Sequence, residues 1–453
     1  MSAPTVSTQT LSPYSEFVNP RWEDFLNLVG MNVRYERCLG TELFTDEGRR
    51  ILDFISGYCV HNTGHNHPLI VQALKDELDK CGPAMLQTDV PELAGELARR
   101  LCALAGGGLT KVFFGSSGSE GVETAIKFCR AATGRTGLLY SEGGFHGLTC
   151  GALSLMSDPF WRNGFGPMLP GAEHVPFGDL AAAEAKLATR RFAGFITEPI
   201  QAESGITLPP QEYLSSVERL CKRYGTIFVL DEVQTGMFRT GPFLAAHHYS
   251  ARPDMVILAK ALSGGLIPCG AVLMTDEIYD AVYSSLQRAF VHTSTFSENG
   301  LAMRAGLATL DVLEGEALGE RATATGAELR LQLSEQLRPF EMVKEVRGAG
   351  LLCGIEFTAP RGLGMRVSFE AFRKIHPAMF GQCLVMRLFR DHGILTQICG
   401  NNFQVLKVAP PLTVSPEQAG EFVSAVRDTV EFAHGSSGYW TEALALVRRG
   451  VNI

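Results

Sequence analysis

The segment Phe228-Val-Leu-Asp-Glu-Val-Gln-Thr-Gly236 places a carboxylate, Asp231, at the end of a short apolar run. The segment Val256-Ile-Leu-Ala-Lys-Ala-Leu-Ser-Gly-Gly265 places an amine, Lys260, at the end of another such run. Each run is apolar or β-branched and is followed by a turn that contains glycine, which is typical of a buried strand in a parallel sheet. Because the carboxyl ends of such strands face the ligand crevice, we expect the two side chains to meet there.

A carboxylate and an amine in one crevice match the needs of pyridoxal 5′-phosphate. This cofactor uses a lysine to hold its aldehyde as a Schiff base and an acid to keep its pyridine nitrogen protonated. We therefore predict a pyridoxal 5′-phosphate site in which Lys260 and Asp231 are catalytic. A nicotinamide-dependent dehydrogenase is disfavoured, because no GxGxxG motif opens the first βα unit.

The composition is that of a large globular enzyme. The 453 residues are enough for two or three domains, and 45% of them are hydrophobic. A net charge of -8 disfavours nucleic acid as a partner. No apolar run approaches the roughly 20 residues of a membrane span, and the N-terminus does not read as a secretory signal. The eleven cysteines are scattered without a CxxC pair, which indicates reduced thiols in a cytoplasmic protein.

Strand and helix patterns alternate from about residue 67 to 315, which predicts an α/β domain with a mainly parallel sheet covered on both faces. The expected strands are 111–114, 137–141, 194–197, 226–230, 255–259 and 270–274, and the expected helices include 120–131 and 211–224. The regular alternation of strand and helix patterns does not continue in residues 316–453. A long helix over 317–337, a strand-rich stretch over 343–357, a hairpin-like pair around 400–402 and a final helix after 415–417 predict a smaller α+β domain. We expect residues 1–66 to pack with this smaller domain.

A strand, a turn rich in glycine and serine, and a helix follow one another in VFFGSSGSEGVETAIKF (112–128). Small residues let backbone N–H groups approach an anion, and the amino end of a helix adds a favourable dipole. Ser117, Gly118 and Ser119 are therefore candidates to bind the phosphate. An ordinary turn with a serine N-cap explains the same string.

Three further strings leave more than one role open. Phe145 in EGGFHGLT can stack on a pyridine ring or belong to the core, and His146 beside it can be a structural histidine. Glu198 and Glu203 in TEPIQAESG are either solvated charges or groups that orient an amine substrate. The three histidines of CVHNTGHNHP (59–68) match no zinc spacing, so we expect no metal site there.

Taken in order, these strings resemble the class III aminotransferases of the ornithine, acetylornithine, putrescine and ω-amine type. The resemblance covers nearly the whole chain and runs through GRRILDFISGY, GHNHP, FFGSSGSEGVETAIKF, SEGGFHG, TEPIQAESG, LDEVQTGMFRTG, PDMVILAKALSGGLIPCGA, HTSTFSEN, VRGAGLLCGIEF and VAPPL. It implies the fold type I of pyridoxal-phosphate-dependent transferases, with a large and a small domain. It also implies a homodimer that transfers an amino group to a 2-oxo acid by ping-pong kinetics.

The resemblance implies a role for each matching residue. Lys260 would hold the cofactor and carry the proton that leaves the substrate carbon, and Asp231 would pair with the ring nitrogen. The other implied cofactor contacts are Phe145 and Val233 on the ring faces, Gln234 on the ring oxygen, Gly118 and Ser119 on the phosphate, Glu198 near the ring, and Thr295 on the phosphate of the neighbouring subunit's cofactor. Tyr58 and Glu203 match positions that contact the substrate.

One position departs from the family pattern. Ornithine-type members carry an arginine shortly before the APPL string that binds the substrate α-carboxylate, whereas QVLKVAPPL has Lys407 there. Lysine lacks the planar fork that binds a carboxylate through two hydrogen bonds. We therefore expect a primary amine, a diamine or an ω-amino compound as donor. An ornithine- or acetylornithine-type substrate, and a racemase, aminomutase or decarboxylase reaction on the same fold, are the alternatives.

Overall fold

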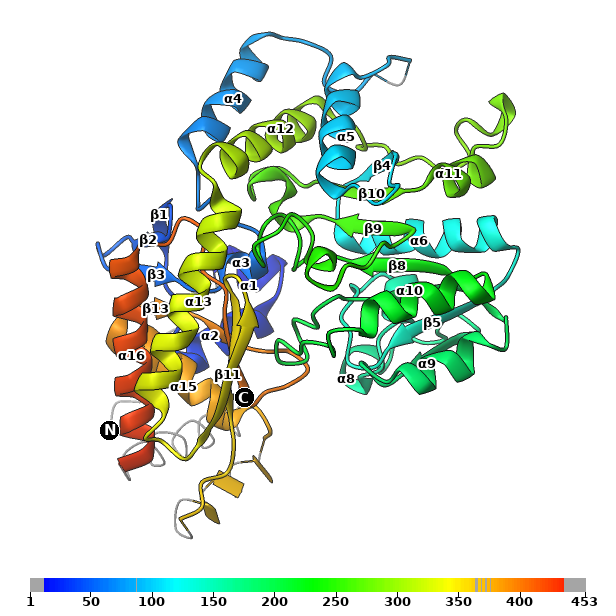
Figure 1. The fold of residues 1–453 in the computed structure, drawn as a ribbon. Helices are drawn as coiled ribbons and strands as arrows, with labels where there is room; N and C mark the ends of the chain where they lie inside the picture. Colours follow the sequence, from blue (N-terminus) through cyan, green and yellow to red (C-terminus); the bar gives the residue numbers. More distant parts are fainter. Residues whose placement is uncertain are drawn as a thin grey trace, which may run out of the picture.

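The computed structural model describes residues 12–435 except 87, 363–365, 368, 371–372 and 375. Residues 1–11 and 436–453, which belong to the first and last predicted segments, lie outside the described residues. Figure 1 shows a larger α/β part built on one long sheet, beside a smaller part that contains two shorter sheets.

The larger part is built on a seven-stranded sheet with the strand order β4-β10-β9-β8-β7-β5-β6. Its strands are β4 (Lys111–Gly115), β5 (Gly137–Ser141), β6 (Ala172–Val175), β7 (Phe192–Thr197), β8 (Ile227–Asp231), β9 (Met255–Leu258) and β10 (Gly270–Met274). Neighbours from β9 to β6 are parallel, whereas β10 is antiparallel to both β9 and β4. The carboxyl ends of the parallel strands therefore meet at one edge of the sheet.

Helices cover both faces of this sheet. They are α6 (Gly118–Thr133), α7 (Cys150–Leu153), α9 (Leu180–Leu187), α10 (Tyr213–Tyr224) and α11 (Asp276–Val282). Successive side chains of β8 alternate between two apolar clusters: Phe228 and Leu230 pack in the cluster that includes α10, and Val229 packs in the cluster that includes α6 and α11. Burial on both faces is the reason that these strands are continuous apolar runs in the sequence.

Two four-stranded sheets form the smaller part, with the orders β1-β2-β3-β13 and β11-β12-β15-β14. Their strands are β1 (Tyr35–Leu39), β2 (Glu42–Thr45), β3 (Arg50–Asp53), β11 (Val343–Ala349), β12 (Leu352–Phe357), β13 (Ile394–Leu395), β14 (Gln397–Ile398) and β15 (Val405–Val408). The helices α13 (Leu318–Leu337), α15 (Met379–His392) and α16 (Pro416–Gly435) pack beside them. Because β3 pairs in parallel with β13, the N-terminal segment joins the C-terminal part.

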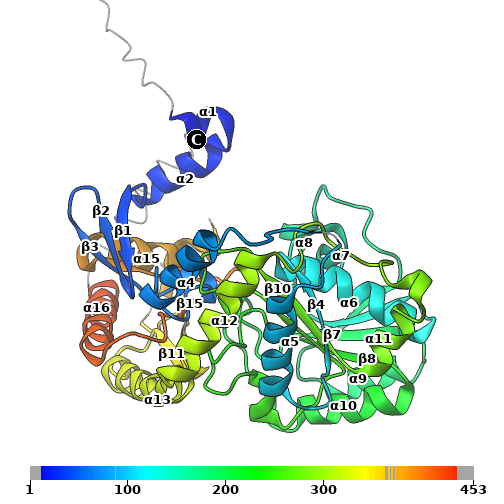
Figure 2. The same cartoon turned by 90° about the horizontal axis from the view of Figure 1, so that it is seen from above.

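The remaining helices connect these parts or extend from them. They are α1 (Pro13–Phe17), α2 (Pro20–Val29), α3 (Ser56–Cys59), α4 (Pro68–Asp79), α5 (Glu92–Ala105), α8 (Pro159–Arg162) and α12 (Gly300–Gly315), with short 3-10 helices at Ala245–Tyr249, Lys260–Ser263 and Leu286–Arg288. Helix α12 packs against α4 and α5. Figure 2 shows α1 and α2 projecting from the body of the molecule.

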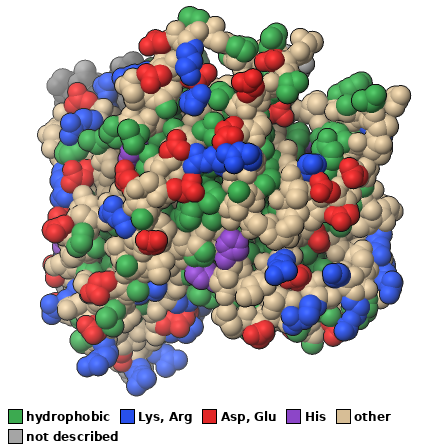
Figure 3. Space-filling model, turned by 45° about the horizontal axis from the view of Figure 1, so that its top comes forward, with side chains coloured by type: hydrophobic (Ala, Val, Ile, Leu, Met, Phe, Trp, Pro, Cys, Tyr) green, Lys and Arg blue, Asp and Glu red, His purple; other side chains and the backbone are tan. Residues whose placement is uncertain are grey.

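Charge is distributed without a single dominant sign on the face drawn in Figure 3, where acidic and basic side chains are interspersed. Among the described residues, no helix has both the length and the apolar character needed to cross a membrane.

The predicted strands of the large sheet are confirmed with small shifts at their ends, and the hairpin around 400–402 is confirmed as β14 and β15. Strand β6 was not predicted. It lies at the edge of the sheet and is mostly half-buried or exposed, so its sequence lacks the continuous apolar run of a central strand. The division of the chain at residues 66 and 315 stays a prediction.

Candidate active site

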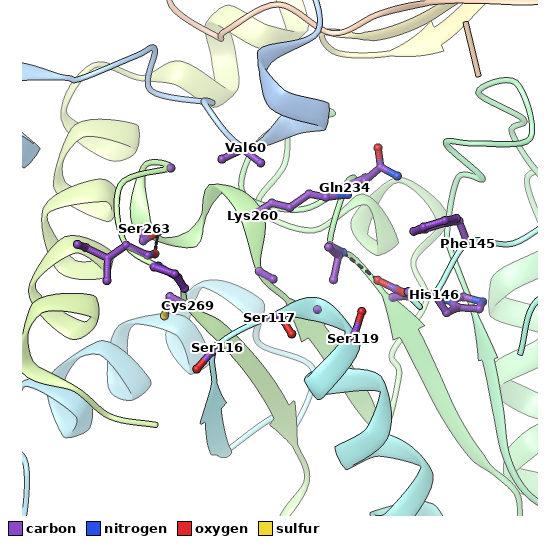
Figure 4. A pocket seen from close by; sticks show the side chains of 18 of the residues that line it. Val60, Ser116, Ser117, Ser119, Phe145, His146, Gln234, Lys260, Ser263 and Cys269 are labelled. Carbon is purple, nitrogen blue, oxygen red and sulfur yellow. Dashed lines mark hydrogen bonds and ion pairs between the residues drawn. The ribbon is translucent and has the colours of Figure 1, made fainter. Parts of the chain in front are cut away.

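Asp231 and Lys260 lie at the carboxyl ends of adjacent parallel strands. Asp231 is the last residue of β8 and is in register with Ile257 of β9, and Lys260 begins the short helix that follows β9. Both line a cavity of about 490 Å³, shown in Figure 4. The same cavity is lined by the predicted cofactor residues Ser117, Gly118, Ser119, Phe145, Glu198, Val233 and Gln234. The parallel strands bring these residues together because each strand ends at the same edge of the sheet.

The phosphate candidates form the first turn of α6, at the floor of the cavity in Figure 4. Ser117 is the N-cap, and its hydroxyl accepts a hydrogen bond from the backbone N–H of Glu120 at 3.2 Å. A Cβ atom at Gly118 would lie 2.9 Å from a methyl carbon of Val233, so glycine is needed for this close approach. Capping by Ser117 and an open amino end favour an anion such as phosphate here.

His146 holds Asp231 in place. Nδ1 of His146 lies 2.8 Å from one carboxylate oxygen of Asp231, and the backbone N–H of Val233 donates to the other oxygen at 3.1 Å. Burial opposes the charged form of His146, but the hydrogen bond and the charge of Asp231 outweigh burial and raise the pKa of His146. The sequence left His146 open as a structural residue. Its place beside Phe145 in the FHG string was the one signal for this role.

Glu198 is a buried carboxylate that organises the loop of Phe145. Its oxygens accept hydrogen bonds from the backbone N–H groups of Phe145 at 2.9 Å and Ala202 at 3.1 Å. Burial raises the pKa of Glu198 to about 7, although the nearby His146 acts in the opposite direction. Glu198 is therefore a buried group and not a solvated charge, and it anchors the aromatic residue of the cavity wall. Its expected place near the cofactor ring stays a prediction.

The amine of Lys260 is isolated. Within the described part of the chain, its side chain makes no hydrogen bond or ion pair, and in Figure 4 it extends toward Gln234. Burial lowers the pKa of Lys260, against the opposing effect of nearby acidic groups. A lowered pKa favours the neutral amine, which is the form that reacts with a carbonyl group and accepts a proton.

The residues of this cavity fit pyridoxal 5′-phosphate. The amino end of α6 suits its phosphate, the carboxylate of Asp231 suits its ring nitrogen, and the neutral amine of Lys260 suits its aldehyde. The amide oxygen of Gln234 is buried and has no partner among the described residues, which leaves it available to a bound group.

Glu203 and Lys407 form a buried ion pair beside the cavity. The amine of Lys407 donates to Oε1 of Glu203, which also accepts from Nε2 of Gln234 at 3.2 Å, while Oε2 accepts from the backbone N–H of Gly400 at 2.9 Å. Burial acts to raise the pKa of Glu203, but Lys407 lowers it to about 2, and Glu203 in turn raises the pKa of Lys407 against the effect of burial. Both groups are therefore charged and already paired.

Tyr58 reaches this ion pair from a left-handed turn. Residues Ser56–Cys59 have φ values of 46°, 62°, 61° and 69°, although only one of them is glycine. Such backbone costs about 1–2 kcal/mol per non-glycine residue, so tertiary contacts must hold it. One such contact is the hydrogen bond from the backbone N–H of Ser56 to Asp53 at 2.7 Å. The result places the amine of Lys407 5.3 Å from the ring centre of Tyr58.

Thr295 does not reach this cavity. It lines a separate cavity of about 680 Å³ together with Tyr283 and His292. This position is compatible with the expected role of Thr295 in a neighbouring subunit, which stays a prediction.

The three histidines of residues 59–68 have structural surroundings. Nε2 of His65 lies 2.7 Å from Asp53, Nε2 of His67 lies 3.0 Å from Glu316, and the ring of His61 stacks on that of His65 at 3.8 Å between centres. Among the described residues, no three His, Cys, Asp or Glu side chains are grouped to hold a metal ion.

Known proteins share this sequence and fold. A family model described as class III aminotransferase matches residues 27–430. The chain is 34% identical over 447 residues to aminotransferase PigE of Serratia sp., which covers 92% of this chain but 52% of PigE, so the chain spans about half the length of that relative. It is also 34% identical over 446 residues to putrescine aminotransferase of Pectobacterium atrosepticum. That match covers 95% of this chain and 90% of the relative. The solved structure of an (S)-enantioselective ω-transaminase from Thermomicrobium roseum is similar to this chain, with a TM-score of 0.79 and 30% sequence identity. That match covers 88% of this chain and 93% of the ω-transaminase chain.

Proposed function

The chain belongs to the class III aminotransferases, which depend on pyridoxal 5′-phosphate, and we propose that it moves the amino group of a primary amine, a diamine or an ω-amino compound to a 2-oxo acid. The observation that carries the choice of donor is the buried pair of Glu203 and Lys407, in which the lysine at the family's carboxylate-binding position is already neutralised. Binding of an α-carboxylate at Lys407, whether that of a donor or that of the 2-oxo acid acceptor, would require this pair to break at a cost, whereas a donor without an α-carboxylate leaves the pair intact.

The residues of the cavity would hold the cofactor at both ends. Ser117, Gly118 and Ser119 would bind its phosphate at the start of α6, and Asp231, held by His146, would bind the protonated ring nitrogen. Lys260 would bind its aldehyde, with Phe145, Glu198, Val233 and Gln234 around the ring. When bound, the cofactor stores the amino group between the two half-reactions and withdraws electrons from the carbon that loses its proton.

Lys260 moves that proton. Its lowered pKa keeps the amine neutral and able to accept a proton at Nζ, and burial keeps competing water away from the same atom. His146 and the backbone N–H of Val233 hold the carboxylate of Asp231 at the base of the cavity through hydrogen bonds. Since the donor leaves before the acceptor binds, the kinetics are ping-pong.

The active unit is a homodimer in which Thr295 contributes to the partner's site. The position of Thr295 in a cavity separate from Lys260 supports this assignment.

The enzyme acts in the cytoplasm. Its eleven free cysteines support this location, since a reducing compartment keeps thiols unpaired.

The experiment that tests this function is a screen of the first half-reaction. The protein is loaded with pyridoxal 5′-phosphate, single donors are added, and the absorbance change from the pyridoxal to the pyridoxamine form is followed. Butylamine and putrescine should convert the cofactor at least about tenfold faster than glutamate, because only glutamate must displace Glu203 from Lys407. Lys407→Arg should improve the use of glutamate, since arginine offers two parallel hydrogen bonds to a carboxylate.

The matched control is Lys344→Arg, at an exposed lysine of β11, which should leave all rates unchanged. Fast conversion by glutamate in the unmodified enzyme would show that another group binds the α-carboxylate and would overturn the donor assignment. A protein that develops no absorbance of bound cofactor at all would overturn the proposed activity.

A further inference from the structure

His292 is held between the large sheet and helix α6. Its ring packs against that of Phe113 of β4, at 4.4 Å between centres, and against that of Phe128 of α6, at 5.0 Å. Its backbone carbonyl accepts a hydrogen bond from the hydroxyl of Tyr283 at 2.9 Å. Both the side chain and the backbone of His292 are therefore fixed, although the residue lies in an irregular segment before α12.

Two hydrogen bonds join the imidazole of His292 to α6 and define its tautomer. Nε2 lies 3.0 Å from the hydroxyl of Thr124, and Nδ1 lies 2.7 Å from the amine of Lys127. The hydroxyl of Thr124 donates its one hydrogen to the carbonyl of Glu120 at 2.9 Å, so its oxygen accepts from Nε2–H. An ammonium group can only donate, so Nδ1 accepts, and the imidazole is neutral. Burial and the positive charge of Lys127 lower the pKa of His292 to about 4, which favours the same form.

The segment 292–299 carries Thr295 from this anchor to the start of α12. At its other end, the side chain of Asn299 caps α12 by accepting a hydrogen bond from the backbone N–H of Ala302 at 2.9 Å. Between the two ends, Thr295 is exposed and lines the cavity of about 680 Å³. The position of Thr295 therefore depends on the contacts that hold the ends of the segment, and His292 is three residues away from it.

Helix α6 is a firm base for this anchor. It packs against β7, β9 and β10 of the large sheet and against α11, and the side chains of Val122, Ala125 and Phe128 are buried there. Loss of the hydrogen bonds to His292 should therefore leave α6, and the phosphate site at its amino end, in place. The exposed segment that carries Thr295 would instead lose its support.

We propose that His292 is a positioning residue for the cofactor of the neighbouring subunit, because it holds the segment of Thr295 against α6. This inference rests on the proposed homodimer, in which Thr295 reaches the partner's cofactor. Helix α6 would then serve both sites of the dimer: its amino end binds one phosphate, and Thr124 and Lys127 hold the segment that reaches the other. A change at His292 should weaken cofactor binding in the partner's site and not in the cavity of its own Lys260.

Mixed dimers separate these two effects. One chain keeps Lys260, the other carries Lys260→Ala, and different affinity tags allow the purification of dimers that contain one chain of each kind. Pyridoxal 5′-phosphate is added at increasing concentration, borohydride attaches it to Lys260, and mass measurement gives the occupied fraction of the chain that keeps this lysine. The measurement therefore reports on one of the two sites and needs no turnover.

His292→Phe keeps an aromatic ring but removes both hydrogen bonds to α6. Placed in the chain with Lys260→Ala, it should raise the half-saturating concentration of pyridoxal 5′-phosphate about tenfold, the effect expected from the loss of two hydrogen bonds. Placed in the chain that keeps Lys260, it should change this concentration by less than about twofold. Lys127→Met, at an exposed residue, removes one of the two bonds and should show the same asymmetry at about threefold.

His174→Phe, at an exposed histidine of the edge strand β6, is the matched control and should change neither site. Equal effects of His292→Phe in the two chains, or no effect in either, would overturn the positioning role, as would a protein that elutes as a single subunit. If His292→Phe forms no dimer, Lys127→Met decides between the same outcomes.

Failure of the proposed function gives a different result. If borohydride attaches no cofactor to Lys260 in any dimer, the cofactor site and the role of His292 are both overturned. An effect confined to the partner's site supports the positioning role even if no amine proves to be a donor.

Discussion

Two buried lysines acquire opposite properties from their surroundings. Lys407 has Glu203 in direct contact, so its pKa is raised despite burial. Lys260 has no such contact within the described residues, so burial prevails and lowers its pKa. One lysine is therefore held as a permanent cation and the other is free to exchange a proton, which is the difference between a structural charge and a reactive amine.

Lys260→Ala should lower kcat by about a hundredfold to ten-thousandfold, because it removes the group that transfers the proton. Borohydride treatment followed by mass measurement should attach the cofactor to the unmodified protein and not to the variant. Lys80→Ala, at an exposed position of the chain, is the control and should behave like the unmodified enzyme in both measurements. Activity of Lys260→Ala within about threefold of the original would contradict the assignment.

Glu198→Gln should weaken the pH dependence of stability in the cofactor-free protein. Burial raises the pKa of Glu198 to about 7 from its ordinary 4.5, so the folded protein keeps a proton that the unfolded chain has released. Stability therefore falls as the pH rises from about 4.5 to about 7, by about 3 kcal/mol from this group at most. Glutamine does not titrate, so the decline should be smaller in the variant.

Melting temperatures across this pH range measure the effect. Glu142→Gln, at an exposed neighbour of the same cavity loop, should keep the original pH dependence. An unchanged pH dependence in Glu198→Gln would show that Glu198 is ionised in the folded protein throughout the range.

At the scale of elements, close backbone contacts decide where helices pack. Helix α13 approaches the turn between β11 and β12 so closely that a Cβ atom at Gly326 would collide with the backbone of Gly350. On α16, Gly420 faces open space. The two glycines look alike in the sequence, and only the neighbouring element distinguishes them.

Gly326→Ala should destabilise the protein by about 3 kcal/mol, because the backbone of Gly350 cannot move aside as a side chain would. Gly420→Ala should instead stabilise it by about 0.5–1 kcal/mol, since alanine loses less conformational entropy in a helix. Urea denaturation of the two variants in parallel measures both changes. A Gly326→Ala protein as stable as the original would show that α13 can shift away from the turn.

At the scale of the whole molecule, Arg239 joins three parts of the chain. Its guanidinium donates to Asn62 and Ser56 of the N-terminal segment, to the carbonyl of Leu351 at 3.0 Å, and to the carbonyl of Pro410. Arg239 itself follows β8 of the large sheet and is fully buried, and within the described residues no carboxylate pairs with it. Because Ser56 belongs to the left-handed turn that presents Tyr58, this cation also supports the strained backbone beside the active site.

Arg239→Gln should lower the free energy of unfolding by about 2–5 kcal/mol, since several buried oxygens lose their donor at once. Thermal and urea unfolding measure the loss, and Arg252→Gln, at an exposed arginine, should change stability by less than about 0.5 kcal/mol. Equal stability of the two variants would show that the hydrogen bonds of Arg239 do not stabilise the packing of these three parts of the chain.

Local pattern was enough to predict most of the large sheet and the cavity at its edge. The central strands are apolar because both faces are buried, so their ends, and with them Asp231 and Lys260, could be located without tertiary information. Strand β6 escaped prediction because an edge strand with partly exposed side chains carries no such pattern.

The sequence by itself determined the fold class, the cofactor chemistry and the substitution of lysine for arginine at position 407, since each depends on residue type and order along the chain. Only the tertiary structure decided that His146 holds Asp231 and that Glu203 neutralises Lys407. These two contacts join residues that are 85 and 204 positions apart in the chain. The physical reason is that burial and the nearest charge set the state of each group, and both arise only when distant segments pack together.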